Sequence, residues 1–471
     1  MRAAVVSSGD RQSRTWVTAG VQLRHVESNR CDLLINLVAT CRIIAMVGRA
    51  ARAEDHSYVS RIADGAVAAA LHSFGAIVIE GPKACGKTET AGQLAVSEVL
   101  LDIDREAQRA ADIDPRLILT GPVPRLIDEW QREPRVWDAV RREVDTRRAS
   151  GQFILTGSAT PAESAVRHSG AGRMVRITMR PMTLFEQKFS PGTVSIRELL
   201  DGRIPPTGTS TLDLAAYAER IVVGGWPGLM GRSVRDAMAF TSGYIDMIVD
   251  HDIDVISGAR RNPRLVRRFL QAYAQLSAHP ARLSTILDRA QAIAQDEAPS
   301  RWTAEPYLDA LRRLMVVDDI EAWNPEVRSK TRLMTTPKRY LVDPSLAAAL
   351  MEFDPARLLG DLNSFGYLFE SLAARDARVY AAADNASVFH YRERAGELEV
   401  DLIVERRDGT WIGVDVKLGS ARIDEAAESL LRLKSARVVR PPAALVILTA
   451  TEYAYQRDDG VIVVPLGLLG P

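Results

Sequence analysis

Residues 76–88, AIVIEGPKACGKT, constrain the fold of this chain more than any other segment. A short apolar run rich in Ile and Val leads into Gly81, and the triplet Gly86-Lys87-Thr88 begins five residues later. This is the G-x-x-x-x-G-K-[ST] spacing of a phosphate-binding loop, which requires a strand in front and a helix behind. The apolar run predicts the strand, and residues 89–100, ETAGQLAVSEVL, predict the helix.

Each residue type in this loop has a physical role. Glycine lets the backbone curl so that successive N–H groups point at phosphate oxygens, and the following helix adds its N-terminal dipole. Lys87 would contact the β- and γ-phosphates of ATP, and Thr88 would offer its hydroxyl to Mg²⁺. A glycine-rich surface turn is the alternative, but the matching flanks favour nucleotide binding. The predicted nucleotide contacts are Gly81, Pro82, Lys83, Ala84, Cys85, Gly86, Lys87, Thr88 and Glu89.

The length and charge of the chain restrict its class. Its 471 residues exceed one ordinary hydrophobic core, so we expect about three domains. The formal net charge is +0, which excludes a global field that would steer the whole chain to nucleic acid or a membrane. The cysteines Cys31, Cys41 and Cys85 lack metal-like or disulfide-like spacing, which predicts a reducing, cytoplasmic environment.

Residues 1–55 differ from the rest and predict a disordered or loosely helical extension. Their apolar stretch, residues 33–47, is interrupted by Asn36 and Arg42 and is too short to span a bilayer. It also begins too late to form a clean secretory signal. Met46 precedes a more regular sequence and is a candidate start of the native product.

Strand-like and helical segments alternate over residues 56–205. Apolar runs at 76–80, 99–103, 125–129, 152–156 and 173–179 predict strands, and the segments between them predict helices. This alternation is typical of an α/β fold, in which a parallel sheet carries helices on both faces. Ligands bind at the carboxyl ends of the strands in such a sheet. We therefore expect a P-loop ATPase domain over residues 56–205.

The remaining chain predicts two further domains. Residues 191–211, rich in Gly, Pro, Ser and Thr, predict a linker or long loop. Residues 206–340 have mostly helical spacing, and two helices (281–291 and 303–314) followed by two strands (316–323 and 338–343) predict a winged-helix module. Residues 341–471 predict an α/β domain with a helix at 364–381 and strands at 387–393, 398–406, 411–419 and 444–450.

An acidic pair, Asp128-Glu129, ends the third predicted strand. About forty residues after a phosphate loop, the first carboxylate is placed to hold Mg²⁺ and the second to polarise the attacking water. Thr156 and Ser158 end the next strand, where a hydroxyl could sense the γ-phosphate or simply satisfy a turn. Arg173 could stabilise transition-state charge, in cis or on a neighbouring subunit of a homo-oligomer. A solvated arginine at the strand edge is the alternative.

A second set of charged residues lies near the C-terminus. Asp401, Asp415 and Lys417 alternate so that they project on one side of adjacent strands. With Glu370 from the preceding helix, they could bind Mg²⁺ and orient water for phosphodiester cleavage. An exposed hairpin with ordinary charges and an inactive nuclease-like fold are the alternatives.

A basic run lies in the helical part of the chain. Arg264, Arg267 and Arg268 share one face of a predicted helix, which could contact a phosphate backbone. A solvated helix surface is the favoured interpretation.

The order of these motifs resembles one protein family. EGPKACGKTET, RLIDEWQREP, FILTGSAT, GAGRMVRITMRPMTLFE, GGWPG, KRYLVDPSLAAAL and EVDLIVE…VDVK together span about residues 55–469. They resemble the prokaryotic AAA-type ATPases that carry a C-terminal domain of unknown function with a restriction-endonuclease-like core. A departure is Asp-x-Lys at residues 415–417, where Glu-x-Lys is commoner. The N-terminal extension has no counterpart in the family.

The resemblance implies roles for individual residues. It implies an AAA-type core with an additional strand and a catalytic glutamate, in which Lys87 and Thr88 contact phosphate and Mg²⁺. It further implies Asp128 as metal ligand, Glu129 as water activator and Arg173 as arginine finger. The set that it implies for a PD-(D/E)xK site is Glu370, Asp401, Asp415 and Lys417.

Two functions follow from this sequence. In the first, a cytoplasmic, Mg²⁺-dependent ATP hydrolase is coupled to a nuclease-like domain, with DNA as a candidate partner. In the second, a regulatory or assembly ATPase carries a catalytically inactive C-terminal domain that binds a partner or nucleic acid.

Overall fold

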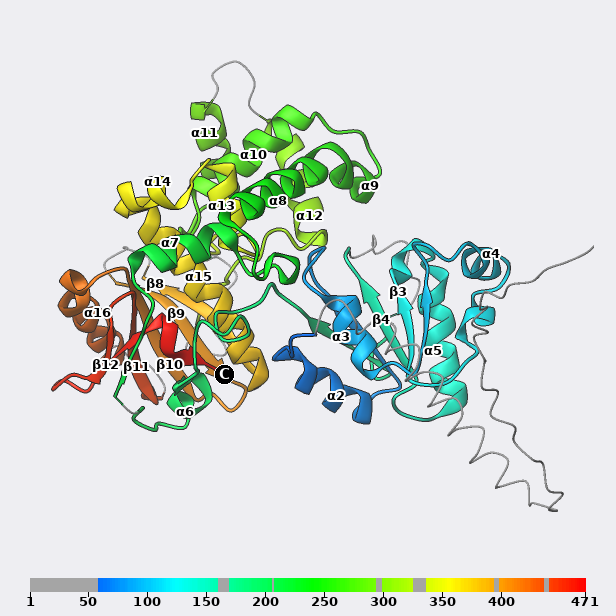
Figure 1. Cartoon of the computed structure of the whole chain (residues 1–471), viewed down its shortest axis with the longest axis horizontal. Coiled ribbons are helices and arrows are strands. Elements are labelled where there is room, and N and C mark those ends of the chain that lie inside the picture. The colour runs from blue at the N-terminus through cyan, green and yellow to red at the C-terminus, as the bar shows by residue number, and fades with distance from the viewer. Residues whose placement is uncertain are drawn as a thin grey trace, which may run out of the picture. The chain divides into compact units, whose positions relative to one another are not determined.

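Five parallel strands form the sheet that carries the phosphate loop in the computed structural model (Figure 1). They are β1 (Ala76–Glu80), β2 (Ser97–Leu100), β3 (Arg125–Asp128), β4 (Phe153–Gly157) and β5 (Met174–Thr178), in the order β2-β3-β4-β1-β5. All five predicted strands are therefore present, although β2 lies at Ser97–Leu100 and overlaps the predicted run 99–103 by only two residues. The predicted helix behind the loop is too long, because α3 (Lys87–Leu94) ends before β2 begins.

The structure describes residues 58–159, 169–205, 207–293, 299–324, 336–393, 398–435 and 440–471. The predicted N-terminal extension lies outside these residues. Within them, no helix is both long and apolar enough to cross a bilayer.

Helices cover both faces of the parallel sheet. Alternate residues of β1 enter different cores: Ala76 and Val78 pack with α5 (Arg135–Arg147), whereas Ile77 and Ile79 pack with α2 (Ala63–Ser73) and α3. A strand buried on both sides needs a continuous apolar run, which explains why AIVIE was recognisable in the sequence. The phosphate loop leaves the carboxyl end of this central strand.

The predicted helices of the middle region are present. They include α7 (Leu214–Val223), α8 (Val234–Met247), the π-helix η5 (Ile248–Asp252), α9 (Ile253–Ser257), α10 (Pro263–Gln275), α11 (Leu283–Ile293) and α12 (Arg301–Arg313). The two strands predicted after α12 do meet antiparallel, but through isolated bridges, Val317 with Leu341 and Ile320 with Lys338. Residues 325–335 between them lie outside the described residues, so the winged-helix module stays a prediction.

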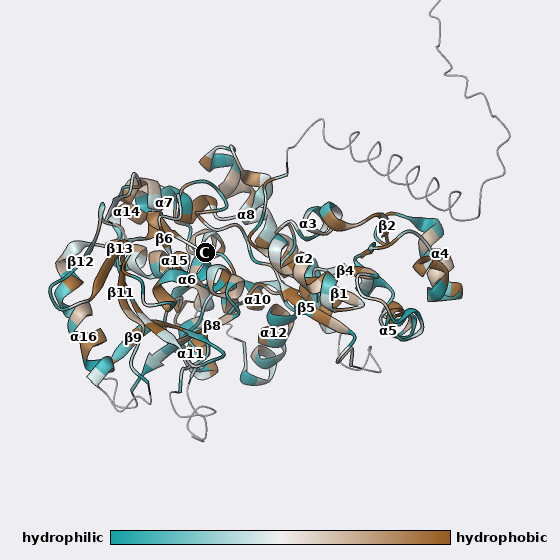
Figure 2. Cartoon of the chain, turned by 90° about the horizontal axis from the view of Figure 1, so that it is seen from below, coloured by the Kyte–Doolittle hydropathy of each residue, from teal (hydrophilic) through white to brown (hydrophobic). Residues whose placement is uncertain are grey.

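The C-terminal part packs helices on a mixed seven-stranded sheet. Its helices are α13 (Pro344–Leu350), α14 (Pro355–Gly360), α15 (Leu362–Ala383) and α16 (Ile423–Ser435). The predicted strands are β8 (Ala386–Arg392), β9 (Glu399–Arg406), β10 (Trp411–Lys417) and β11 (Ala444–Thr449), joined by β12 (Tyr453–Gln456) and β13 (Ile462–Pro465). The central strands β11 and β13 are strongly hydrophobic, whereas α4 (Arg105–Ile113) and α5 alternate between polar and apolar residues (Figure 2).

The prediction of a linker or long loop at residues 191–211 is wrong. This segment holds β6 (Val194–Ser195), α6 (Ile196–Leu200) and β7 (Gly208–Thr209). β6 pairs with β14 (Leu469–Gly470), and β7 extends the seven-stranded sheet beside β12. Strands of two residues have no periodicity, so composition alone could not reveal this pairing.

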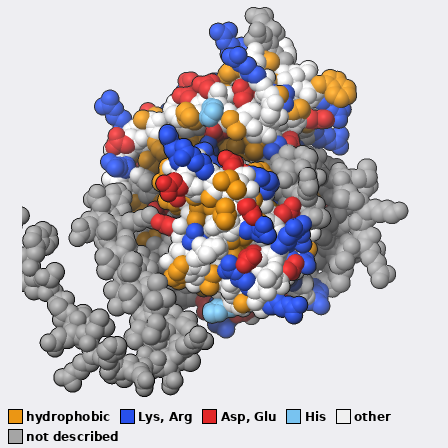
Figure 3. All heavy atoms as spheres, turned by 90° about the vertical axis from the view of Figure 1, so that its right-hand side faces the viewer, with side chains coloured by type: hydrophobic (Ala, Val, Ile, Leu, Met, Phe, Trp, Pro, Cys, Tyr) orange, Lys and Arg blue, Asp and Glu red, His pale blue; other side chains and the backbone are white. Residues whose placement is uncertain are grey.

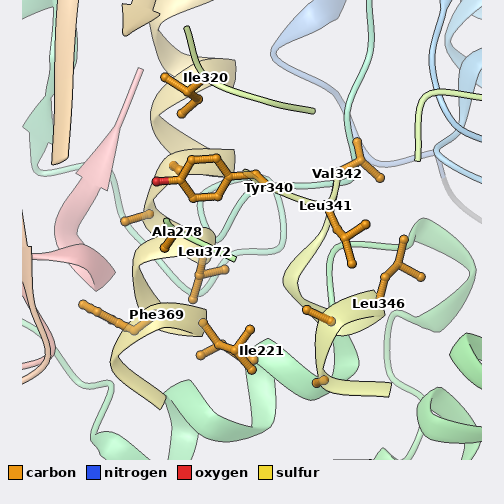
Figure 4. Packing of buried hydrophobic residues seen from close by; sticks show 14 of the residues in the cluster. Ile221, Ala278, Ile320, Tyr340, Leu341, Val342, Leu346, Phe369 and Leu372 are labelled. Atoms are coloured by element: carbon orange, nitrogen blue, oxygen red, sulfur yellow. The ribbon is translucent and has the colours of Figure 1, made fainter. Parts of the chain in front are cut away.

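One hydrophobic core joins the helical region to the C-terminal sheet. Tyr340, Phe369 and Leu372 belong to it, together with Ile221 from α7 (Figure 4). Residues 58–471 accordingly form one compact unit. The domain boundaries at residues 205 and 340 stay predictions.

Candidate functional site

Glycine is required at two positions of the phosphate loop. Gly86 precedes α3 with φ 97°, a backbone conformation that side chains disfavour. A Cβ on Gly81 would lie 2.4 Å from the carbonyl oxygen of Met179, so no larger residue fits there. The loop between them therefore keeps the tight curl that turns amide groups towards a bound phosphate.

A buried ion pair supports the loop from behind. Arg61 contacts Glu186 at 2.9 Å, and the side chains are only 4% and 1% exposed. The same guanidinium donates to the carbonyl oxygens of Cys85 (2.7 Å) and Arg180 (2.7 Å). Sequence analysis missed this ion pair, because Arg61 and Glu186 are 125 residues apart and no motif spacing links them.

Two hydroxyl groups meet at Asp128. Thr88 Oγ1 donates to Asp128 Oδ1 at 2.9 Å, and the hydroxyl of Thr156 donates to the same oxygen. Hydroxyl and carboxylate oxygens are the ligands that Mg²⁺ prefers. The oxygen ligands at the end of β3 therefore fit a nucleotide-bound Mg²⁺. Thr88 and Asp128 are the residues that would hold this ion, directly or through a water molecule.

Glu129 lies beside this set in a restrained geometry. Its φ is 51°, a left-handed conformation that is uncommon outside glycine. Ser158 Oγ lies 3.1 Å from both carboxylate oxygens, and the side-chain amide of Gln131 donates to one of them. Thr156 and Ser158 therefore both direct their hydroxyl groups to the acidic pair, and a role in sensing the γ-phosphate stays a prediction.

The loop lysine is buried and already paired. Lys87 is 6% exposed, and its Nζ donates to the carbonyl oxygen of Pro82 at 2.8 Å. It lies inside the curl of the loop. There, an oxygen of a bound phosphate would replace the neutral carbonyl oxygen as the acceptor for Nζ.

A cavity of about 1030 Å³ opens in front of these groups. The loop, Glu129 and Ser158 line one side of it. The helical region also contributes to the lining, with Pro227, Gly228, His251, Asp252, Val255, Ile256, Arg313 and Leu314. This volume is at the upper end of the range that is usual for ligand pockets.

An ion pair crosses the rim of this cavity. Lys83 Nζ in the loop contacts Asp252 Oδ1 at the end of the π-helix η5 at 2.7 Å. π-Helical turns inside α-helices are frequent at functional sites. Sequence analysis did not find the contribution of residues 227–314 to the cavity, because it depends on tertiary packing.

Arg173 lies at the amino end of β5, whereas the phosphate loop follows the carboxyl end of the neighbouring strand β1. It precedes Met174, which pairs with Ala76 at the amino ends of β5 and β1. The loop leaves β1 five residues later, roughly 16 Å away at the usual rise of a strand. The guanidinium contacts Asp145 at 2.6 Å. Arg173 therefore does not reach the site of its own chain, and a role on a neighbouring subunit stays a prediction.

The C-terminal carboxylates converge, but around a lysine that the sequence analysis did not include. Lys338 Nζ lies 2.6 Å from Glu370 Oε1 and 2.7 Å from Asp401 Oδ1. Lys417 forms an ion pair with Asp415 and lies 3.8 Å from Asp401 Oδ2. Among the described residues, no group of three or more His, Cys, Asp or Glu side chains is arranged to hold a metal ion.

The charged groups of this cluster shift one another's pKa values. Burial and the neighbouring Asp401 raise the pKa of Glu370 to about 7, against the pull of Lys338. Burial opposes ionisation of Asp401, but Lys338 and Lys417 bring its pKa below the ordinary value. Burial and the charge of Asp401 raise the pKa of Asp415 well above its usual range.

His390 in β8 is buried close to this cluster. It has 0% exposure, and its Nε2 lies 3.1 Å from the carbonyl oxygen of Thr336, whereas Nδ1 has no hydrogen-bond partner among the described residues. Burial, together with the charge of Lys338, lowers the pKa of His390 to about 4. The native protein therefore holds this imidazole neutral.

We expect acid to destabilise the protein through His390. The unfolded chain takes up the proton near pH 6.5 and the folded chain only near pH 4, so this contribution is complete above pH 6.5 and is lost as the pH falls to 4. The loss amounts to about 3 kcal/mol. Urea unfolding of His390→Gln should show a smaller decrease between pH 7 and pH 4.5 than the wild type. The exposed His72→Gln should keep the full decrease.

The fold and the site define a class of protein. Residues 73–187 match the family model described as an AAA domain, and they carry the phosphate loop and the acidic pair on a parallel sheet. This part of the chain is an AAA-type P-loop ATPase domain. Residues 214–357 and 365–469 match two families described as domains of unknown function, DUF8612 and DUF4143. The restriction-endonuclease-like core stays a prediction.

Two curated relatives are similar to this chain over most of its length. Uncharacterized proteins of Mycobacterium bovis and Mycobacterium tuberculosis are each 26% identical to it over 401 residues, which is 84% of this chain and 81% of theirs. Among solved structures, a Walker-type ATPase of Pyrococcus abyssi is 14% identical, with a TM-score of 0.37, and covers 61% of this chain and 94% of its own. That structural likeness is too weak to support further assignments.

Proposed function

We propose that this chain is a Mg²⁺-dependent ATP hydrolase whose nucleotide lies between the ATPase domain and the helical region. The observation that carries the proposal is the convergence at Asp128 of the Thr88 and Thr156 hydroxyls, with Glu129 beside them facing the same cavity. Phosphoryl transfer requires this kind of positioning and charge neutralisation.

Each residue has a part in this mechanism. The loop amides and Lys87 bind the β- and γ-phosphates, and Thr88 with Asp128 would hold Mg²⁺, which neutralises phosphate charge when bound. Glu129 orients the attacking water and accepts its proton, while Ser158 holds that carboxylate in place.

Glu129→Gln tests the hydrolytic step. Glutamine keeps the shape of the side chain and its hydrogen bonds but cannot accept the proton, so turnover should fall by about 10²–10³-fold. ATP binding should stay within about twofold of wild type, since the phosphate contacts remain. Phosphate release and titration with a fluorescent ATP analogue measure the two effects. Glu133→Gln makes the same charge change outside the cavity and should retain turnover; undiminished hydrolysis by Glu129→Gln would disprove the role of Glu129.

We propose that nucleotide binding is coupled to the C-terminal domain. Asp318 supports this, because it contacts Arg180, next to β5, at 2.6 Å and Arg378 on α15 at 2.9 Å. A shift of the ATPase sheet on nucleotide binding would therefore act directly on the helix that carries Glu370.

The C-terminal domain has two candidate roles. In the first, it cleaves DNA under the control of ATP; in the second, it is an inactive module that binds a partner or nucleic acid. Arg267 on α10 forms an ion pair with Asp246, so the predicted basic face of this helix is partly neutralised. On the face drawn in Figure 3, basic and acidic side chains are interspersed. Cytoplasmic location and self-association stay predictions.

A further inference from the structure

We propose that the ammonium group of Lys338 occupies the cation position of the C-terminal carboxylate cluster, so that this domain holds no catalytic metal. This inference is independent of ATP turnover. It rests on the contacts that surround one buried lysine, which the sequence places outside the nuclease-like motif.

The ammonium group satisfies its donors with carboxylates. Nζ of Lys338 lies 2.6 Å from Glu370, 2.7 Å from Asp401 and 3.5 Å from Glu399. A lysine has three donors and no acceptor, so these oxygens are the partners it needs. The lysine side chain is 1% exposed, which leaves no water to replace them.

A divalent cation would need the same place. Glu370 and Asp401 would have to approach a Mg²⁺ ion to 2.0–2.1 Å, or a Ca²⁺ ion to 2.3–2.6 Å. Lys338 already lies between these two carboxylates. A metal and a buried ammonium group cannot share that position, because both the space and the charge are taken.

The rest of the cluster is also occupied. The second oxygen of Asp401 accepts the backbone N–H of Val416 at 2.9 Å, and Asp415 is paired with Lys417. Tyr340 donates its hydroxyl to Glu370 at 2.5 Å. The residues that resemble a metal-dependent nuclease site therefore do not fit a metal in this chain.

Lys338 is held in place by its own segment. Its backbone exchanges two hydrogen bonds with Ile320, at 2.9 and 3.0 Å. The next residue, Arg339, contacts Asp319 at 2.6 Å, and Tyr340 packs in the hydrophobic core (Figure 4). The lysine is thus part of a fixed structure that brings a positive charge into the cluster from outside the sheet.

Mn²⁺ titration of the nucleotide-free full-length chain tests the proposal. The number of Mn²⁺ ions bound per chain, measured by electron paramagnetic resonance, should be the same for the wild type and for Asp401→Asn. Neither protein holds an ion at the cluster. Lys338→Ala should gain a Mn²⁺ site, and Mn²⁺ should raise its melting temperature by a few degrees. Lys338→Met fills the same space without charge and should gain no site, and Asp401→Asn added to Lys338→Ala should remove the gain.

Three outcomes would overturn the proposal. The first is a wild-type Mn²⁺ site that Asp401→Asn abolishes. The second is wild-type cleavage of supercoiled plasmid, with Mg²⁺ or Mn²⁺, that Asp401→Asn abolishes. The third is a folded Lys338→Ala protein without any gain of Mn²⁺. If Lys338→Ala does not fold, the comparison of wild type with Asp401→Asn decides the question alone.

Discussion

Replacement of Lys87 by alanine is expected to weaken ATP binding by about 10- to 100-fold and to lower turnover by at least about 100-fold. A hydrogen bond to a charged group contributes about 1.5–3 kcal/mol, which corresponds to this loss of affinity. Turnover falls further because charge on the transferred phosphoryl group must be stabilised in the transition state. Lys87 lies inside the loop curl, where its Nζ donates to the carbonyl oxygen of Pro82.

Calorimetric ATP titration and phosphate release measure these losses. Lys434→Ala removes the same charge from an exposed position on α16 and should leave both quantities unchanged. Since Lys87 is buried, thermal unfolding should accompany the measurement, and Lys87→Met serves as a variant that keeps the packing. Wild-type turnover by a folded Lys87→Met protein would contradict the site.

Local pattern was sufficient to predict the ATPase sheet and its loop. Strands such as AIVIE are buried on both faces, so they form continuous apolar runs that need no knowledge of neighbours. The loop and the acidic pair are likewise short motifs with fixed spacing. Their meeting at Thr88 and Asp128 follows from the parallel order of β1, β4 and β3.

Contacts between distant segments were beyond prediction from the sequence. Arg61 reaches Glu186, and Lys338 reaches Asp401 across 63 residues, and no periodicity or motif spacing links the members of either pair. Arg173 shows the converse, since its motif suggested a catalytic finger, but strand direction places it at the amino end of β5, away from the phosphate loop of its own chain. A motif identifies residue types, whereas topology decides which of them meet.

Arg375→Met is expected to lower the free energy of unfolding by about 3–5 kcal/mol. Arg375 on α15 contacts Asp343 and Asp376 at 2.8 Å each, and all three side chains are 2% exposed or less. Methionine removes the positive charge and leaves both carboxylates buried without a counter-charge. Such uncompensated charge is far more costly than the loss of an exposed ion pair.

The arginine also secures contacts between separate segments. Asp343 accepts the backbone N–H of Gly225 at 3.0 Å, and Asp376 accepts that of Leu184 at 2.9 Å. Loss of Arg375 should therefore loosen the junction between the ATPase domain, the helical region and α15 together. Proteolysis near residues 184 and 225 should accelerate in the variant.

Urea unfolding separates the charge effect from the loss of packing. Arg422→Met, at an exposed pair with Glu425, should change the free energy of unfolding by no more than about 0.5 kcal/mol. Adding Asp343→Asn and Asp376→Asn to Arg375→Met removes the unpaired charges while keeping the amide acceptors, so part of the lost stability should return. An Arg375→Met protein as stable as the wild type, or a triple variant less stable than the single one, would show that charge compensation is not what this arginine provides.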